Sequence, residues 1–262
     1  YPANNSSAPS PVIIDLSHLG HEIHRRYDEH GIIKVFDDSN KRYLSFGTAD
    51  EQSCQLKSNP NQPQHDYVRA MLSVLMQTNA PERIAVIGTG GGGLTSFLYH
   101  HYLESHIDTV DLRSAVIHIA HQYFGLPRSP RLSTHVCSAN EFFTQKAQTQ
   151  DTQYDLIFSD IYLADGLSTE QLNADFLMHS RQLLTNNGWL VLNLWKEHRG
   201  EDAFIQQLEE HFSTLTTATT KDGNWLILAS PNADALVGKT ECRQRAKAVS
   251  YTHLTLPTKR IV

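Results

Sequence analysis

The pattern of hydrophobic and polar positions changes near residue 80 of the 262-residue chain. Before that point, β-branched and aromatic residues form short runs separated by Gly31, residues 37–40 and Gly47, which is typical of antiparallel hairpins. After Arg83, short apolar runs alternate with helical patterns, which predicts a parallel sheet with right-handed crossovers. The strands expected in this sheet are residues 83–88, 107–112, 132–137, 154–160 and 188–195.

Two further segments complete the predicted fold. Residues 65–78, "HDYVRAMLSVLMQT", place apolar side chains at helical spacing and end shortly before Pro81. Near the end of the chain, "FSTLTTATT" and "NWLILAS" are joined only by "KDG", which predicts an antiparallel hairpin. We therefore expect an α/β fold with a doubly wound, Rossmann-like sheet, closed by this hairpin and preceded by a small antiparallel β domain.

The chain is expected to divide into three parts. Residues 1–62 would form a leader and the small N-terminal β domain, and residues 63–248 the Rossmann-like domain. Residues 249–262, "VSYTHLTLPTKRIV", resemble a translated sequencing adapter, so we expect a non-native tail there.

Composition and charge narrow the range of functions. A net charge of −6 disfavours nucleic acid as a partner and is compatible with a small cationic substrate. No apolar run approaches the roughly 20 residues of a membrane span. The three cysteines are far apart in the sequence, which disfavours a disulfide framework and a zinc ribbon. These features predict a soluble, cytoplasmic protein with no membrane or nucleic-acid partner.

A glycine-rich loop follows the first strand of the expected parallel sheet. In "RIAVIGTGGGGL", Gly88, Gly90 and Gly93 match GxGxxG, and the loop opens an apolar helix. Glycine permits positive φ and a close approach of a ligand to the backbone, and a helix N-terminus offers unpaired N–H groups. Asp111, about 20 residues on, ends the second strand, where a carboxylate can accept both ribose hydroxyls. The pair predicts a nucleoside site, whereas the glycine run alone would equally fit a tight structural turn.

The terminal hairpin bears on which nucleoside is bound. By analogy, a doubly wound sheet closed by an antiparallel hairpin is typical of proteins that bind S-adenosylmethionine or a relative. Folds that bind NAD usually continue with parallel strands. The pattern therefore favours the sulfonium nucleoside over NAD.

Several motifs together resemble the spermidine synthase family of polyamine aminopropyltransferases. They are "KVFDDSNKRYLSFGTADEQ", "IGTGGGG", "VDLRSAVIHIAHQYF", "YDLIFSD" and "LLTNNGWLVLN", within about residues 31–231. The resemblance implies transfer of an aminopropyl group from decarboxylated S-adenosylmethionine to a small amine or polyamine. It also implies a homodimer or homotetramer.

The resemblance assigns roles to particular residues. Asp160 matches the catalytic aspartate that positions and deprotonates the attacking amine, although a helix cap or an Asx-turn is the structural alternative. Gln52, Tyr67 and Asp165 are expected on the substrate side, with a core role as the alternative for Tyr67. The residues expected to bind the nucleoside are Gly88, Thr89, Gly90, Gly91, Gly93, Asp111, Leu112, Ser138 and Ala139.

Three positions depart from the family pattern. Gly91 stands where the family has an aspartate that grips the amine of the aminopropyl arm. Leu163 replaces a second aspartate, with Asp165 two residues on, and Ser138 replaces the aspartate that contacts adenine. Three functions therefore stay open: an aminopropyltransferase, a methyltransferase that uses intact S-adenosylmethionine, and a catalytically silent nucleoside-binding homologue.

The 15 histidines raise the question of a metal site. Their spacings match neither HExxH nor the i, i+4 pairing of a zinc helix, so no metal is expected. Trp189, Trp195 and Trp225 fall in expected strands and are predicted to belong to the core rather than to a polyamine cage.

Overall fold

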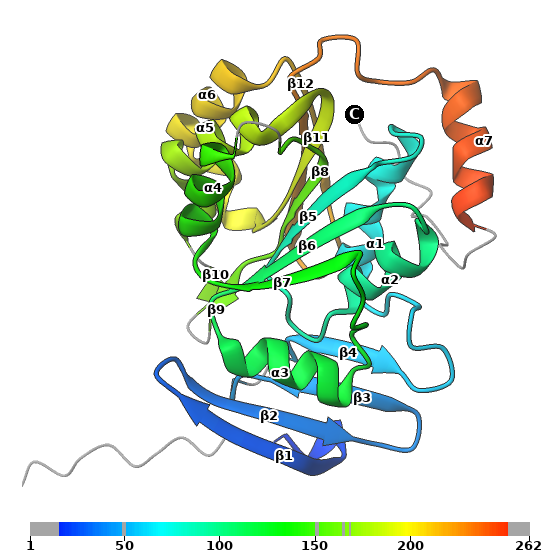
Figure 1. Cartoon of the computed structure of the whole chain (residues 1–262), viewed down its shortest axis with the longest axis vertical. Coiled ribbons are helices and arrows are strands. Elements are labelled where there is room, and N and C mark those ends of the chain that lie inside the picture. The colour runs from blue at the N-terminus through cyan, green and yellow to red at the C-terminus, as the bar shows by residue number, and fades with distance from the viewer. Residues whose placement is uncertain (1–15, 49–50, 150–151, 164–165, 168, 251–262) are drawn as a thin grey trace, which may run out of the picture.

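The computed structural model describes residues 16–48, 51–149, 152–163, 166–167 and 169–250. Within them, a four-stranded antiparallel sheet lies beside a seven-stranded mixed sheet that is flanked by helices (Figure 1). This arrangement confirms the expected fold class. No helix in these ranges has the length and apolar character that a membrane crossing requires.

The N-terminal sheet contains four strands in chain order, each antiparallel to the next. They are β1 (His21–Asp28), β2 (Gly31–Asp37), β3 (Lys41–Ser45) and β4 (Ser53–Leu56). The first three are joined by short turns, as the runs of apolar residues predict.

The larger sheet has the order β12-β13-β11-β8-β5-β6-β7. The strands β7, β6, β5, β8 and β11 are parallel, and β13 is antiparallel to both of its neighbours, β11 and β12. The predicted terminal hairpin is thus confirmed as β12–β13. The bounds are β5 (Arg83–Ile87), β6 (His106–Asp111), β7 (Leu132–Val136), β8 (Tyr154–Ser159), β11 (Leu184–Trp195), β12 (Thr214–Thr219) and β13 (Asn224–Ser230).

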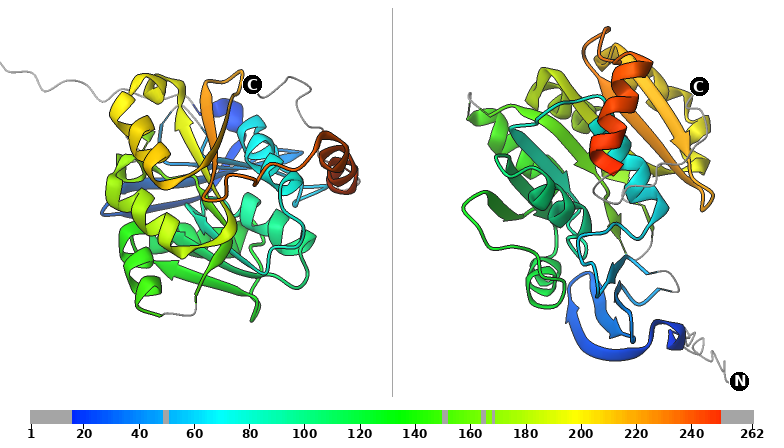
Figure 2. Two further views of the ribbon diagram at one scale, coloured as in Figure 1. Left: turned by 90° about the horizontal axis from the view of Figure 1, so that it is seen from above. Right: turned by 90° about the vertical axis from the view of Figure 1, so that its right-hand side faces the viewer.

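Helices cover both faces of this sheet, as Figure 2 shows. The helices α1 (Asp66–Met71), α2 (Gly93–His101) and α7 (Lys239–Ser250) lie on one side, and α4 (Ala139–Gln148), α5 (Ala174–Leu183) and α6 (Asp202–His211) on the other. A 3₁₀ segment, Leu72–Met76, continues α1. Helix α3 (Ser114–Tyr123) lies between the two sheets. Short elements occur at Ser17–Leu19, Tyr162–Leu163 (β9), Gly166–Leu167 (β10), Thr169–Leu172 and Lys196–Gly200.

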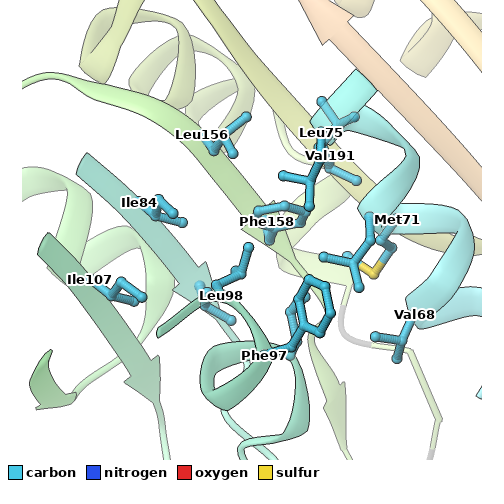
Figure 3. Close-up of a cluster of buried hydrophobic side chains, with 14 of the residues drawn as sticks. Val68, Met71, Leu75, Ile84, Phe97, Leu98, Ile107, Leu156, Phe158 and Val191 are labelled. Carbon is cyan, nitrogen blue, oxygen red and sulfur yellow. The ribbon is translucent and has the colours of Figure 1, made fainter. Parts of the chain in front are cut away.

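Alternation of side chains along β5 builds two hydrophobic cores, one on each face of the sheet. Ile84 and Val86 of β5 face α1 and α2, whereas Ala85 and Ile87 face α4 and α5, because successive side chains of a strand point to opposite faces. Figure 3 shows the first cluster, in which Phe97 and its neighbours on α2 pack against the sheet. Both faces are buried at β5, β8 and β13, which is why these strands are largely apolar.

The strand β11 begins earlier than expected. The sequence "LTNNG" resembles a turn, yet Leu184 already pairs with Tyr154 of β8, and the register shifts before Trp189. Gly188 allows this irregularity because a Cβ there would lie 2.9 Å from the Tyr154 carbonyl oxygen.

A buried ion pair joins the N-terminal sheet to the larger one. Arg113, which follows β6, is 3% exposed at its side chain and pairs in bidentate fashion with Asp28 at 3.0 and 2.7 Å. It also donates to the Gly31 carbonyl at 2.9 Å and lies 4.8 Å from the centre of the Phe46 ring. Through Arg113, the N-terminal sheet therefore fixes the segment that follows Asp111.

Replacing Asp28 with asparagine is expected to lower the free energy of unfolding by about 3 kcal/mol, because it leaves a buried guanidinium without its counter-charge. Denaturant titration measures this change. The matched control is Glu22→Gln on the same strand, which breaks an exposed pair with Arg25 and is expected to change the free energy of unfolding much less. Equal losses in the two variants would contradict the role given to the Asp28–Arg113 pair.

Candidate active site

One cleft collects almost all of the predicted site residues. It lies at the carboxyl ends of β5, β6, β7 and β8 and is bordered by β4 and the start of α1, with about 1260 Å³ of empty volume including its open mouth. Ligands of open α/β sheets bind at this edge. The predicted residues that line it are Gln52, Tyr67, Gly88, Thr89, Gly90, Gly91, Gly93, Asp111, Leu112, Ser138, Ala139 and Asp160. Asp165 lies outside the described residues.

Gly88 brings the glycine loop against the strand that carries Asp160. Its φ is +95°, and a Cβ there would lie 2.0 Å from the Asp160 carbonyl oxygen. The Asp160 N–H donates to the Ile87 carbonyl at 2.8 Å, which extends the pairing of β5 with β8. A side chain at position 88 would therefore push apart the two segments that form the floor of the cleft.

The turn that leads into α2 requires glycine at position 92, whereas the GxGxxG motif indicates Gly93. Gly92, with φ +77°, precedes α2 in the left-handed region, whereas Gly93 is the first residue of α2, and a Cβ on Gly93 would meet no other atom within 4 Å. Gly93 lines the cleft, but the backbone does not require glycine there.

Asp111 organises the loop from the end of β6. Its Oδ2 accepts hydrogen bonds from the backbone N–H groups of Thr89 at 3.1 Å and Gly90 at 3.4 Å, and its Oδ1 accepts from Arg113 at 3.0 Å. Burial raises the pKa of Asp111, although these N–H groups oppose that effect by favouring the charged form. A carboxylate fixed in this way is pre-oriented to accept further hydrogen bonds from a ligand in the cleft.

Asp160, just beyond β8, is held by two other polar side chains. The Asn193 Nδ2 donates to Asp160 Oδ1 at 2.8 Å, and the Tyr67 hydroxyl also hydrogen-bonds to the carboxyl group. Burial raises the pKa of Asp160 to about 6 because it penalises the charged form more than the two hydrogen bonds favour it. Near neutral pH the group is therefore a carboxylate close to its titration, which suits a proton acceptor.

Behind Asp160 lies a buried polar network that the sequence patterns did not predict. The Asn193 Oδ1 accepts from Asn224 at 3.0 Å, its backbone carbonyl accepts from Gln171 at 3.1 Å, and Gln171 accepts from Ser159 at 2.7 Å. Asn193 is fully buried in the apolar strand β11. The asparagine in the otherwise apolar run "WLVLNLW" is the sequence feature that indicates such a network, since a buried polar side chain requires a hydrogen-bond partner.

The side of the cleft near Asp160 combines aromatic and uncharged polar groups. Tyr67 stacks on His65 with ring centres 5.4 Å apart, and burial with the nearby Asp160 charge holds the pKa of Tyr67 well above its ordinary value. Burial lowers the pKa of His65 to about 4, so its imidazole is neutral and does not repel a cation at neutral pH. Tyr162 and four glutamines also line the cleft: Gln52, Gln55, Gln62 and Gln64.

The structure gives a physical reason for glycine at position 91. A Cβ there would lie 2.8 Å from the Ser53 Cβ and 3.3 Å from the Phe124 ring. The Ser53 Oγ accepts a hydrogen bond from the Gly91 N–H at 2.8 Å. Strand β4 thus fills the space that a side chain on the loop would need.

Ser138 begins α4 as its N-cap. Its Oγ accepts a hydrogen bond from the Glu141 N–H at 3.1 Å, which satisfies one of the unpaired donors of the first turn. Ser138 also lines the cleft, and the cap uses one of the two lone pairs of its oxygen.

The comparisons with known proteins agree with this fold and identify the family. A model of the Spermine/spermidine synthase domain matches residues 65–222. The polyamine aminopropyltransferase of Vibrio vulnificus is 31% identical over 244 residues, or 88% of this chain and 80% of that protein. A probable spermidine synthase from Corynebacterium glutamicum has a TM-score of 0.68 at 16% identity, covering 93% of this chain and 97% of that one.

A methyltransferase shares the fold as well. Human Methyltransferase-like protein 13, solved in complex with SAH, has a TM-score of 0.65 at 22% identity and covers 75% of this chain and 96% of that one. The structural likenesses establish the fold, and the domain match together with the Vibrio vulnificus relative establishes the family. The chain belongs to the spermine/spermidine synthase family.

Proposed function

We propose that this protein transfers the aminopropyl group of decarboxylated S-adenosylmethionine to a small primary amine. Membership of the family and the activity named for the Vibrio vulnificus relative support this function. The observation that carries it is the buried Asp160 carboxylate, with a pKa of about 6, in the same cleft as the glycine loop and Asp111. The nucleoside would lie against the loop with its ribose hydroxyls on Asp111 and its sulfur towards Asp160.

The proposed reaction is an in-line displacement. The acceptor arrives as an ammonium ion with a pKa of about 10. Ionised Asp160 holds this ion and accepts one of its protons, which frees the nitrogen lone pair. A C–N bond forms at the aminopropyl carbon as the C–S bond breaks, and the bonding pair passes to sulfur. 5′-Methylthioadenosine and a secondary ammonium ion leave, and Asp160 returns its proton to solvent.

The neighbours of Asp160 have positioning roles in this proposal. Asn193 fixes one carboxylate oxygen, and the Tyr67 hydroxyl, which stays protonated, donates to the same group. Gln52 and neutral His65 offer uncharged polar contacts to the acceptor. Asp165 remains a proposed contact for a distal ammonium. Residues 63–248 would supply the nucleoside site, with β4 of the N-terminal sheet closing it.

Product analysis tests the function directly. The chain is incubated separately with decarboxylated and with intact S-adenosylmethionine, each with a panel of monoamines and diamines, and products are identified by mass spectrometry. We expect an aminopropylated amine and methylthioadenosine from the decarboxylated donor. Failure to form them, with the nucleoside bound, would refute the proposed function.

One observation favours a methyltransferase as the second candidate. At Gly91 no side-chain carboxylate faces the donor's tail, so the loop would not repel the carboxylate of intact S-adenosylmethionine. The fold is also shared with a methyltransferase. In the same experiment this candidate predicts a methylated amine and S-adenosylhomocysteine from the intact donor.

The titration of Asp160 predicts an acid limb in the pH profile. We expect kcat/KM for the amine to fall as pH decreases through about 6, because the protonated carboxyl group cannot accept a proton. Initial rates across buffers of constant ionic strength measure the profile. A rate that stays constant on both sides of this pH would argue against Asp160 as the proton acceptor.

A further inference from the structure

Beside Asp111, apolar side chains form the walls of the cleft. Leu112, directly after Asp111, is 41% exposed although it lines the cleft. Ile161, which follows β8, and Ala139, at the start of α4, also line the cleft. An exposed leucine beside a carboxylate that can hold a ribose is suited to contact a flat, apolar base face.

A carboxylate also lines the cleft, beside the first turn of α4. Glu170, in the 3₁₀ segment Thr169–Leu172, lines the cleft and accepts a hydrogen bond from the Asn140 N–H at 2.8 Å. That N–H belongs to the first turn of α4, beside Ser138. Burial raises the pKa of neighbouring Cys137, and the charges of Glu141 and Glu170 add to this effect.

Ser138 and Glu170 therefore both accept hydrogen bonds from backbone N–H groups in the first turn of α4. The Ser138 Oγ caps the helix through Glu141, whereas Glu170 brings a full negative charge to the cleft from a distant part of the sequence. A carboxylate is the stronger acceptor of the two and offers several lone-pair directions.

We infer that Glu170 accepts a hydrogen bond from the exocyclic amino group of the bound base and so selects a 6-aminopurine nucleoside. The inference rests on the proposed function for the presence of the nucleoside. A 6-oxopurine would turn a carbonyl oxygen towards the carboxylate, and two acceptors that face each other repel. Glu170 is thus a specificity-determining residue, separate from the group that accepts the amine's proton.

The test compares 5′-methylthioadenosine with 5′-methylthioinosine, which carries an oxo group in place of the amino group. Calorimetric titration of the wild-type chain is expected to show about a 10- to 100-fold preference for methylthioadenosine. In Glu170→Gln this ratio is expected to fall by at least about 10-fold, because the amide can donate to an oxo group. The amide oxygen can still accept from the Asn140 N–H, so this contact with α4 is expected to be kept.

Glu141→Gln is the matched control. It removes an acid from the same turn, but Glu141 is exposed and does not line the cleft, so the nucleoside ratio is expected to stay at the wild-type value. A Glu170→Gln ratio equal to that of wild type would overturn the inference and leave the proposed function standing. A wild-type chain that binds both nucleosides equally would also overturn it, whether or not the variant folds. Binding of neither nucleoside would overturn the proposed function and this inference together.

Discussion

Replacing Asp160 with asparagine is expected to lower turnover by about 100- to 10,000-fold while methylthioadenosine binding changes little. Asparagine preserves the shape of the side chain and can accept from Asn193, but it cannot take a proton from the amine. Rates under saturating donor, together with calorimetric titration, separate the two effects. The control is Asp155→Asn at the opposite end of β8, which is expected to retain turnover.

The Asp160→Asn variant is also expected to be more stable than the wild type at about pH 8. The pKa of Asp160 is raised in the folded state, from an ordinary 3.8 to about 6, so the folded protein loses stability as pH rises through this window. Asparagine removes the cost of burying the charge, which is about 3 kcal/mol above the window. Below about pH 4 the difference is expected to vanish. A variant that is less stable at high pH and equally active would contradict the role of Asp160.

Replacing Asp111 with asparagine is expected to weaken methylthioadenosine binding by about 100-fold, because the proposed site would lose its charged acceptor for the ribose hydroxyls. Asp111 also receives the N–H groups of Thr89 and Gly90, so the loop itself is loosened. Calorimetric titration measures the affinity.

The 2′-deoxy analogue isolates the contact with ribose. Loss of the 2′-hydroxyl is expected to weaken binding to the wild type. The same loss is expected to have a much smaller effect on binding to Asp111→Asn, because this variant already lacks the carboxylate that would accept from the hydroxyl. Equal losses in both proteins would show that the sugar does not contact Asp111.

The fold could be predicted from local sequence patterns because each strand and helix has the hydrophobic spacing and the flanking turn residues that its type requires. The apolar run from Ile84 to Ile87 is short, is followed by glycines and precedes a helical pattern, so a buried parallel strand was the natural interpretation. The turn "KDG" identified the hairpin for the same reason. Asp111 and Asp160 could be placed together because parallel strands end at a common edge of the sheet.

The remaining features depend on contacts between distant parts of the sequence. Ser53 fills the space beside Gly91 only because β4 crosses the glycine loop. Asn193 reaches Asp160 only once β11 pairs with β8, and Glu170 reaches α4 across a connection that follows β8. Spacing along one chain does not reveal such pairings, although a polar residue in a buried strand indicates that one exists.

The most direct test of the account is the structure of the chain with methylthioadenosine bound. We predict that the ribose hydroxyls contact Asp111, that the loop lies against the nucleoside, and that the sulfur is directed towards Asp160. A nucleoside bound elsewhere, or a sulfur directed away from Asp160, would contradict it.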